Sequence, residues 1–277
     1  MIGKDLSNSY FKSKKIAIDV INGPAVTALN KANIEVLDAK LILEKARVIK
    51  SSEELKCMKA AIDVAEIAIG KIRKELKAGM TENELWSILH KTNIEHGGEW
   101  VDCRLLSSGQ RTNPWLQECS NKIIQKGEIL SFDTDMIGPY GYTADISRTF
   151  VEGNKFSENQ KKLYLMAVEH INYNSRLIKP GISFKEFAEK SWKLPDEYYG
   201  NRYVNMVHGV GLCDEWPSIR YPSDGGQKEG FFEKNMTINV ESYIGKVGGA
   251  EGVKLEQQYL IGENGLELMS HHPLEDL

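Results

Sequence analysis

The stretch EILSFDTDMIGPYGYTADISRTF, residues 128–150, decides the fold. Its first ten residues, 128–137, have the composition of an apolar strand, in which Asp133 and Asp135 fall on one face because strand side chains alternate. The glycine-containing segment that follows has turn composition, so the next run, which carries Asp145, can pair back as a hairpin. The sequence therefore predicts an antiparallel hairpin that holds three aspartates.

Three more candidate ligands lie farther along the chain. Residues 236–244 and 253–261 are predicted as strands that carry Glu241 and Glu256. His208 stands in the run Val-His-Gly-Val-Gly-Leu, whose glycines let the backbone and a ligand approach closely. An exposed strand face is the alternative interpretation of the first two aspartates, and a structural role is the alternative for the histidine.

Five carboxylates and one imidazole carry too much charge to lie together without metal. Hard carboxylate oxygens with one histidine suit a pair of first-row divalent ions, with bridging carboxylates between them. We therefore predict a site for two metal ions whose ligands are Asp133, Asp135, Asp145, His208, Glu241 and Glu256. This set suits iron, manganese, cobalt or zinc.

Predicted helices precede the strands. Apolar residues recur at intervals of three and four from Leu55 to Leu76, which indicates a helix with one buried stripe. Capping boxes predict three helix starts, after Ser51, Thr81 and Ser157. The runs 77–85 and 179–187 share one order of residue types. Each has Lys, a small residue or Pro, Gly, an apolar residue and a residue with a hydroxyl group, and then, after two variable positions, Glu and an apolar residue. We interpret this match as internal pseudosymmetry between two halves.

Residues 1–48 are expected to be distinct from the rest of the chain. Apolar runs at 16–21 and 34–36 flank a helical segment at 24–32 and lead into a connector. This is too little to fold alone, and it looks like the end of a βα domain whose beginning is absent. The predicted catalytic domain covers residues 49–277.

The composition argues against several classes of partner. The 277 residues are 41% hydrophobic with a formal net charge of −4, which gives no reason to expect nucleic acid or an anionic membrane as partner. No apolar run reaches the ~18 residues that span a bilayer, and residues 1–15 lack the apolar segment of a secretory signal. Scattered cysteines fit reduced thiols, so we expect a cytoplasmic protein.

The motifs around the six candidate ligands resemble those of the pita-bread metallohydrolases, the fold of methionine aminopeptidase, prolidase and creatinase. The matching motifs are Phe-Asp-Thr-Asp, Asp-Ile-Ser-Arg-Thr, His-Gly-Val-Gly-Leu, Val-Glu-Ser and Leu-Glu-Gln, in the family's order over residues 51–277. The resemblance implies an α/β (α+β) pita-bread fold, in which helices wrap a pseudo-symmetric curved antiparallel sheet. Residues 1–48 resemble the end of the creatinase-type N-terminal domain, so we expect a truncated form of that domain.

Two departures distinguish this sequence from the peptidases of that fold. Those peptidases usually carry a histidine in the loop before the first metal aspartate, but residues 109–115 contain none. They also usually carry a second histidine, in a His-Glu pair, where residues 212–217 read Leu-Cys-Asp-Glu-Trp-Pro. Both histidines serve peptide chemistry, so their loss beside an intact ligand set argues for another use of the metals.

Other segments look like the dimethylsulfoniopropionate lyases of the DddP type, which release dimethyl sulfide and acrylate. The segments are residues 97–100, 111–115 and 211–217. The similarity covers most of the chain from residue 51, and it implies an iron-dependent homodimer that acts on a small molecule.

The same resemblance assigns roles to single residues. Asp214 matches the position of the catalytic base, and Tyr203 matches a tyrosine that contacts the substrate. Glu215 is an alternative base, and a turn or cap role is the alternative for Asp214.

The implied substrate pairs a carboxylate with a sulfonium cation. A metal can take the carboxylate as a Lewis acid while a base removes the α proton, after which dimethyl sulfide leaves from the β carbon. Aromatic faces attract cations, by roughly 0.5–2 kcal/mol each. The candidates for such contacts are Tyr203, Trp100, Trp115 and Trp216. Core packing is the alternative interpretation of each tryptophan.

Three functions therefore compete. The first is the metal-dependent lyase. The second is a metallopeptidase of the Xaa-Pro dipeptidase or aminopeptidase type, which needs other residues in place of the missing histidines. The third is a binding module without catalysis, which predicts degraded ligands, whereas all six ligands are intact in the sequence.

Overall fold

A computed structural model describes the chain at residues 14–225, 229–275 and 277. The chain divides into two compact units, Met1–Arg47 and Val48–Leu277. Among the helices of the described residues, none is both long enough and apolar enough to cross a membrane. The expectation that residues 1–15 carry no secretory signal falls almost wholly outside the described residues.

The first unit contains the predicted strand, helix and strand. β1 (Lys15–Ile18) pairs in parallel with β2 (Glu35–Asp38), and α2 (Gly23–Lys31) lies between them in the sequence. This helix begins after Asn22, whose side chain accepts a hydrogen bond of 3.0 Å from a backbone amide of the first turn. A further helix, α3 (Lys40–Ala46), occupies the segment that was predicted as a connector.

The three predicted capping boxes begin the long helices of the second unit. α4 (Ser52–Glu75), α5 (Glu82–Glu95) and α6 (Glu158–Leu177) each follow a Ser or Thr that caps the third helical amide, and the Glu or Gln at that position bonds back to the cap. Met58 and Ile62 belong to the apolar stripe of α4 and are buried. Burial of each such side chain contributes roughly 1.5–3 kcal/mol, so packing of this face holds the helix.

The first half of the second unit consists of α4, α5 and two small antiparallel sheets. One sheet has the order β4-β5-β8, and the other has the order β3-β6-β7. The strands are β3 (Trp100–Val101), β4 (Leu106–Ser108), β5 (Ile129–Phe132), β6 (Met136–Ile137), β7 (Thr143–Ala144) and β8 (Arg148–Val151). Short 3-10 helices are η1 (Gly109–Thr112), η2 (Pro139–Gly141) and η3 (Glu152–Asn154).

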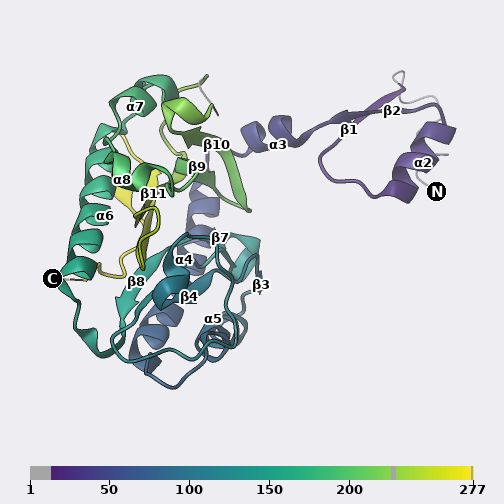
Figure 1. Ribbon diagram of the computed structural model, residues 1–277. Helices are drawn as coiled ribbons and strands as arrows, with labels where there is room; N and C mark the ends of the chain where they lie inside the picture. The colour runs from purple at the N-terminus through teal and green to yellow at the C-terminus, as the bar shows by residue number, and fades with distance from the viewer. Residues whose placement is uncertain (1–13, 226–228, 276) are drawn as a thin grey trace. The chain divides into compact units, whose positions relative to one another are not determined.

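The second half is built on a five-stranded antiparallel sheet of order β10-β9-β11-β12-β13. Its strands are β9 (Asn205–Val210), β10 (Asp214–Arg220), β11 (Thr237–Gly245), β12 (Gly252–Ile261) and β13 (Leu266–Leu268). α6 packs along β11 and β12 (Figure 1), and α7 (Phe184–Lys190) packs against β10. The remaining short helices are α8 (Asp196–Tyr199) and η4 (Pro222–Asp224).

The two halves repeat one order of elements, as the duplicated motif in the sequence predicts. Each half has a long helix, then a shorter helix, then antiparallel strands. In each half the cap residue of the shorter helix forms an isolated antiparallel bridge with a later segment. These bridges are Thr81 with Ile123 and Ser183 with Phe231. The correspondence supports the predicted internal repeat.

The prediction of one continuous strand over residues 128–137 is wrong. The segment is divided into β5 and β6, which belong to different sheets, and Asp133, Thr134 and Asp135 lie in the break. Asp135 has a φ of 34°, a left-handed value that aspartate tolerates better than most residues. A regular strand holds alternate side chains roughly 7 Å apart, whereas the break turns both carboxylates toward Asp145. The predicted hairpin is confirmed, since β6 pairs with β7 and β5 with β8.

Candidate metal centre

The register of the five-stranded sheet places two like charges directly opposite each other. Glu241 on β11 pairs with Glu256 on β12, and on the other side of β11 Asn239 pairs with His208 of β9. Facing side chains on neighbouring strands have Cβ atoms about 4.5–5.5 Å apart, so two facing carboxylates repel each other. Both glutamates are buried, which requires a cation to compensate them.

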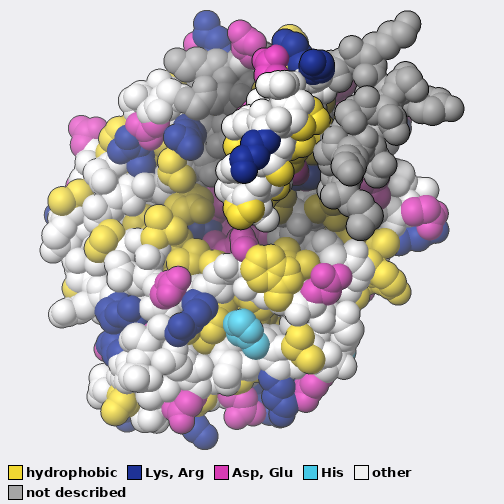
Figure 2. Space-filling model, turned by 90° about the vertical axis from the view of Figure 1, so that its right-hand side faces the viewer, with side chains coloured by type: hydrophobic (Ala, Val, Ile, Leu, Met, Phe, Trp, Pro, Cys, Tyr) yellow, Lys and Arg dark blue, Asp and Glu magenta, His cyan; other side chains and the backbone are white. Residues whose placement is uncertain are grey.

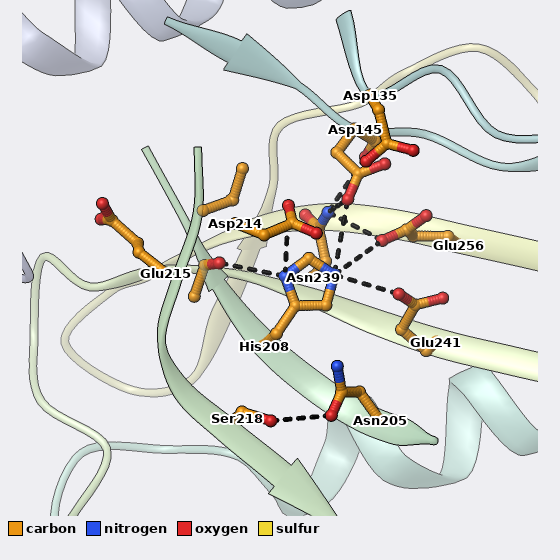
Figure 3. Close-up of polar contacts among 12 residues, drawn as sticks. Asp135, Asp145, Asn205, His208, Asp214, Glu215, Ser218, Asn239, Glu241 and Glu256 are labelled. Carbon is orange, nitrogen blue, oxygen red and sulfur yellow. Dashed lines mark hydrogen bonds and ion pairs between the residues drawn. The ribbon is translucent and has the colours of Figure 1, made fainter. Parts of the chain in front are cut away.

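Three aspartates from the first half meet these residues, and Figure 3 shows two of them, Asp135 and Asp145. The six predicted ligands form two groups that share Asp145, and within each group one ligand atom per residue lies within 4.8 Å of the others. The groups are Asp145, His208, Glu241 and Glu256, and Asp133, Asp135 and Asp145. The structure therefore brings all six predicted ligands together, from segments far apart in the sequence.

His208 is oriented by the backbone beside it. Its Nδ1 lies 3.0 Å from Gly209 O, the arrangement in which Nδ1–H donates to a carbonyl. Its Nε2 then faces carboxylate oxygens of Glu241 at 3.0 Å, Glu256 at 3.3 Å and Asp145 at 3.4 Å. An imidazole nitrogen directed among three carboxylates has the placement of a metal ligand.

The buried oxygens of this cluster suit divalent cations. Asp133 and Asp145 are 3% and 2% exposed, and the Oδ1 atom of each accepts no hydrogen bond within the described parts of the chain. Burial, and next the charge of Glu256, raises the pKa of Asp145 well above its ordinary value. The same two causes raise the pKa of Glu241 to about 8. Buried, unpartnered and mutually repelling oxygen donors with one imidazole fit divalent metal ions, so these residues can hold them.

A lysine outside the predicted ligand set lies inside the cluster. Lys254 is fully buried, and its Nζ lies 3.0 Å from Asp133 Oδ2 and 3.3 Å from Glu256 Oε2, and also contacts Glu241. Burial alone would lower the pKa of Lys254, but these carboxylates raise it well above its ordinary value. If two divalent ions were bound, the five carboxylates would keep one negative charge, which the Lys254 ammonium would neutralise.

The sequence contains the signal for Lys254. It stands two residues before Glu256 in β12, and residues two apart in a strand share a face. A lysine on the same strand face as a predicted ligand therefore points into the cluster.

Asn239 and Ser147 orient the carboxylates further. Asn239 Nδ2 donates to Asp145 Oδ2 at 2.7 Å and to Glu256 Oε1 at 2.8 Å. Ser147 Oγ donates to Glu256 Oε2 at 2.8 Å. Hydrogen bonds of this kind fix which oxygen atoms stay available to a metal. Strand alternation places Asn239 beside Glu241, so its position follows from the sequence although its two partners do not.

The two candidate bases point in different directions (Figure 3). Asp214 begins β10, and its Oδ1 lies 3.7 Å from His208 Nδ1 with 53% of the side chain exposed. Glu215 is buried and forms an ion pair with Lys50. Of the two, only Asp214 is therefore both exposed and directed at His208.

Two of the four aromatic candidates border the cluster. Lys254 Nζ lies 4.7 Å from the ring centroid of Tyr203 and 5.8 Å from that of Trp115. Trp100 on β3 is 53% exposed. Trp216 packs edge-on against a buried phenylalanine, with ring centroids 5.2 Å apart, and joins the apolar core of the second half. Core packing thus accounts for Trp216, and substrate contact stays a prediction for all four residues.

Comparison with known proteins identifies the family. The profile of metallopeptidase family M24 matches residues 56–263, a range that includes all six predicted ligands. The chain belongs to metallopeptidase family M24. Both groups of predicted ligands in this M24 protein, Asp214 and the helices α5 and α6 therefore lie within the family region.

Two curated relatives of this M24 protein are dimethylsulfoniopropionate lyases named DddP. The lyase of Roseovarius nubinhibens is 39% identical over 270 residues, which cover 94% of this chain and 60% of the relative. The lyase of Roseobacter denitrificans is 38% identical, over 95% of this chain and 60% of the relative. The chain therefore spans about 60% of the length of these relatives. A Xaa-Pro dipeptidase of Pyrococcus furiosus is 29% identical, over 83% of this chain and 65% of that protein.

Solved structures agree with the predicted fold of this M24 protein. The prolidase from Pyrococcus furiosus superposes with a TM-score of 0.83 at 24% identity, over 99% of this chain and 79% of that chain. A dipeptidase from Pyrococcus horikoshii gives a TM-score of 0.86 at 22% identity, over 99% and 76%. The predicted pita-bread fold is thus confirmed, with its antiparallel strands and surrounding helices.

A buried histidine on α6 predicts that the stability of this M24 protein depends on pH. His170 on α6 is 1% exposed, and its Nδ1 lies 3.0 Å from the Oγ of Ser242, the residue after Glu241. Burial lowers the pKa of His170 to about 4. Because an unfolded histidine has a pKa of about 6.5, protons bind the unfolded chain first. The contribution of His170 to stability is therefore complete above about pH 6.5 and is lost as the pH falls toward about 4.

We expect His170→Gln to reduce the loss of stability in acid. The full shift corresponds to about 3 kcal/mol of unfolding free energy between neutral pH and pH 4. Denaturant unfolding of the unaltered chain and the variant, between about pH 7.5 and about pH 4.5, measures the difference. His271→Gln, at an exposed position, is the matched control. Identical pH profiles for the unaltered chain and His170→Gln would contradict the assignment.

Proposed function

We propose that this chain carries the catalytic domain of a metal-dependent lyase that cleaves dimethylsulfoniopropionate to dimethyl sulfide and acrylate. The observation that carries the proposal is a half-exposed aspartate, Asp214, whose carboxylate lies 3.7 Å from His208 at the edge of the candidate metal centre. In the sequence it stands where peptidases of this fold usually have a histidine. The match to two proteins named as dimethylsulfoniopropionate lyases supports the substrate.

The proposed reaction is a base-initiated β-elimination. Asp214 takes the proton from the carbon next to the substrate carboxylate. The electron pair of that C–H bond forms the C=C bond of acrylate, while the bond between the β carbon and sulfur breaks and its electrons stay on sulfur. Sulfur thereby leaves as neutral dimethyl sulfide. The proton on Asp214 returns to solvent through the exposed part of the side chain.

The proposed cofactors are two divalent metal ions, for which iron is our first candidate. When bound, they supply Lewis acidity toward the substrate carboxylate. The chain's own residues prepare the ligands for them: Asn239 holds Asp145 and Glu256 in fixed orientations, and Lys254 reduces the repulsion among the carboxylates. Manganese, cobalt and zinc also suit this donor set.

The sulfonium end of the substrate is proposed to contact the aromatic residues beside the centre. Tyr203 is half-buried, and one face of its ring is turned to the ammonium of Lys254 at 4.7 Å. We propose that the sulfonium contacts the other face of this ring, because the quadrupole of an aromatic ring attracts cations. Trp115 and Trp100 are further candidates, whereas the packing of Trp216 in the core makes it the weakest of the four.

We expect Tyr203→Ala to weaken binding of the sulfonium substrate. Loss of one aromatic face costs roughly 0.5–2 kcal/mol, so KM should rise about 2- to 30-fold. Tyr203→Phe keeps the ring and is the matched control. A neutral thioether analogue should inhibit Tyr203→Ala and the unaltered protein alike. If both ligands lost affinity equally, the case for cation recognition by Tyr203 would end.

Two assays on the metal-loaded protein test the proposed function. Gas chromatography measures dimethyl sulfide released from dimethylsulfoniopropionate, and amino-acid analysis measures proline released from Xaa-Pro dipeptides. The alternative function, a Xaa-Pro dipeptidase, is favoured by the 29% identity to an enzyme of that name. Proline release without dimethyl sulfide would replace the lyase by the dipeptidase.

The proposed setting is a cytoplasmic homodimer. Cys57, Cys103 and Cys119 are free thiols, as a reducing compartment allows. On the face shown in Figure 2, acidic and basic side chains of the described residues are interspersed, in keeping with a small-molecule substrate. Sedimentation of the full chain measures its oligomeric state.

A further inference from the structure

β10 begins with two adjacent acidic residues that serve different partners. Successive side chains of a strand point to opposite faces, and Asp214 faces His208 while Glu215 points away from it (Figure 3). The Asp214 side chain is 53% exposed, and that of Glu215 is 0% exposed. Both residues share one short piece of backbone, so whatever fixes Glu215 also fixes the direction of Asp214.

Glu215 is fixed by Lys50, far away in the sequence. The two side chains are 0% and 2% exposed and form an ion pair. Lys50 is itself anchored, because its N–H donates to Asn235 O at 2.8 Å and the neighbouring Ile49 bridges to Met236. The ion pair therefore joins the start of β10 to the segment that leads into β11, the strand of the ligand Glu241. A buried pair of this kind holds its geometry because separation leaves uncompensated charge.

The turn that follows the ligand histidine packs directly on this ion pair. A Cβ atom at Gly211 would lie 2.6 Å from Glu215 Oε1 and 3.0 Å from Lys50 Cε, so only glycine allows the turn to approach so closely. Gly211 O also accepts a hydrogen bond of 2.8 Å from Thr143 N of β7, the strand before the ligand Asp145. The ion pair and β7 thus enclose the turn from two sides.

The Asp214 side chain is held less firmly than the backbone beneath it. Its distance of 3.7 Å from His208 Nδ1 is longer than a hydrogen bond, and that nitrogen already lies 3.0 Å from Gly209 O. The direction of the carboxylate therefore depends on the backbone at the start of β10. We propose that the Lys50–Glu215 ion pair is the positioning element that aims Asp214 at the substrate. The proposal rests on the proposed role of Asp214 as the base.

Substitution of Glu215 tests the proposal. Glu215→Gln keeps the shape of the side chain and removes its charge, so kcat for dimethyl sulfide release should fall while KM and metal content stay unchanged. A displacement of about 1 Å of a reacting group costs on the order of 100-fold, so we expect a loss of about 10- to 100-fold. Lys50→Met should behave in the same way. Lys50→Arg keeps the ion pair and should retain most of the turnover.

A double-mutant cycle separates positioning from general support of the fold. In an Asp214→Asn background, Glu215→Gln should change the residual turnover by less than about twofold, because no base is left to aim. Glu275→Gln, which breaks the partly buried Arg73–Glu275 pair, is the matched control and should lower the melting temperature without lowering kcat.

Two results would overturn the positioning role while leaving Asp214 as the base. One is an equal loss of turnover from Glu215→Gln in both backgrounds, and the other is a fall in metal content that parallels the fall in kcat. If Asp214→Asn alone keeps its turnover, the role of Asp214 as base fails, and the positioning role fails with it. The cycle thus distinguishes the failure of the two proposals.

Discussion

Asp214→Asn is expected to lose nearly all lyase turnover while it keeps its metal ions and binds substrate normally. Asparagine has nearly the shape of aspartate but cannot accept the proton. Removal of a general base typically costs about 10²- to 10⁴-fold in rate. Half of the Asp214 side chain is exposed and its backbone is held by neighbouring residues, so the variant should fold. Turnover, metal content and melting temperature should be measured on one preparation.

The three measurements distinguish three roles for Asp214. If Asp214 is the base, Asp214→Asn loses turnover but keeps a normal metal content and a normal melting temperature. A seventh ligand gives metal content that falls together with turnover. A turn residue gives normal turnover and a lower melting temperature, and near-normal turnover would eliminate the proposed mechanism.

Asp135→Ala is expected to lose metal and, with it, all activity. Asp135 is one of three aspartates whose oxygens lie within 4.8 Å of one another, and burial, and next the charge of Asp133, raises its pKa well above the ordinary value. Without this carboxylate the site holds cations less tightly, and the remaining carboxylates repel one another with less cation to hold them. The melting temperature should therefore fall as well.

The backbone at this position requires a control of its own. Asp135 has a φ of 34°, which alanine tolerates less well than aspartate or asparagine does. Asp135→Asn keeps the backbone preference and removes the charge, so it should also lose metal but lose less stability than Asp135→Ala. Asp63→Ala, at an exposed position of α4, controls for the loss of a carboxylate elsewhere. Full metal occupancy in Asp135→Asn would refute the ligand assignment.

Local rules predict much of the fold and of the candidate site. Capping boxes predict the starts of the long helices because they involve residues only three apart. Strand alternation also involves near neighbours in the sequence, so it correctly places Glu241 and Asn239 on one face. Five of the six predicted ligands follow from charge, since carboxylates on apolar strands require compensation, and His208 follows from its glycine-rich segment. The structure brings these six together, and their role as ligands stays a prediction.

Features that depend on distant contacts could not be predicted in this way. Alternation alone makes residues 128–137 one strand, but the strand is interrupted at Asp133 to Asp135, where the carboxylates approach Asp145 in the matching interruption between β7 and β8 of the same hairpin. The facing of Glu241 and Glu256 depends on the register between strands, which no local pattern specifies. The pairing of Lys50 with Glu215 joins residues that are far apart in the sequence, and no pattern of neighbouring residues links them.

Lys254 bears on how the protein acquires its metals. A centre whose charges are balanced only by metal cannot finish folding until ions arrive, so the first ion available is built in with the fold. Here a resident ammonium already contacts three of the carboxylates, so it lowers the repulsion among them before any ion binds, although it balances only one of the five negative charges. We therefore expect the apoprotein to fold with a lower melting temperature than the metal-loaded protein, and reloading with iron, manganese, cobalt or zinc to raise that temperature.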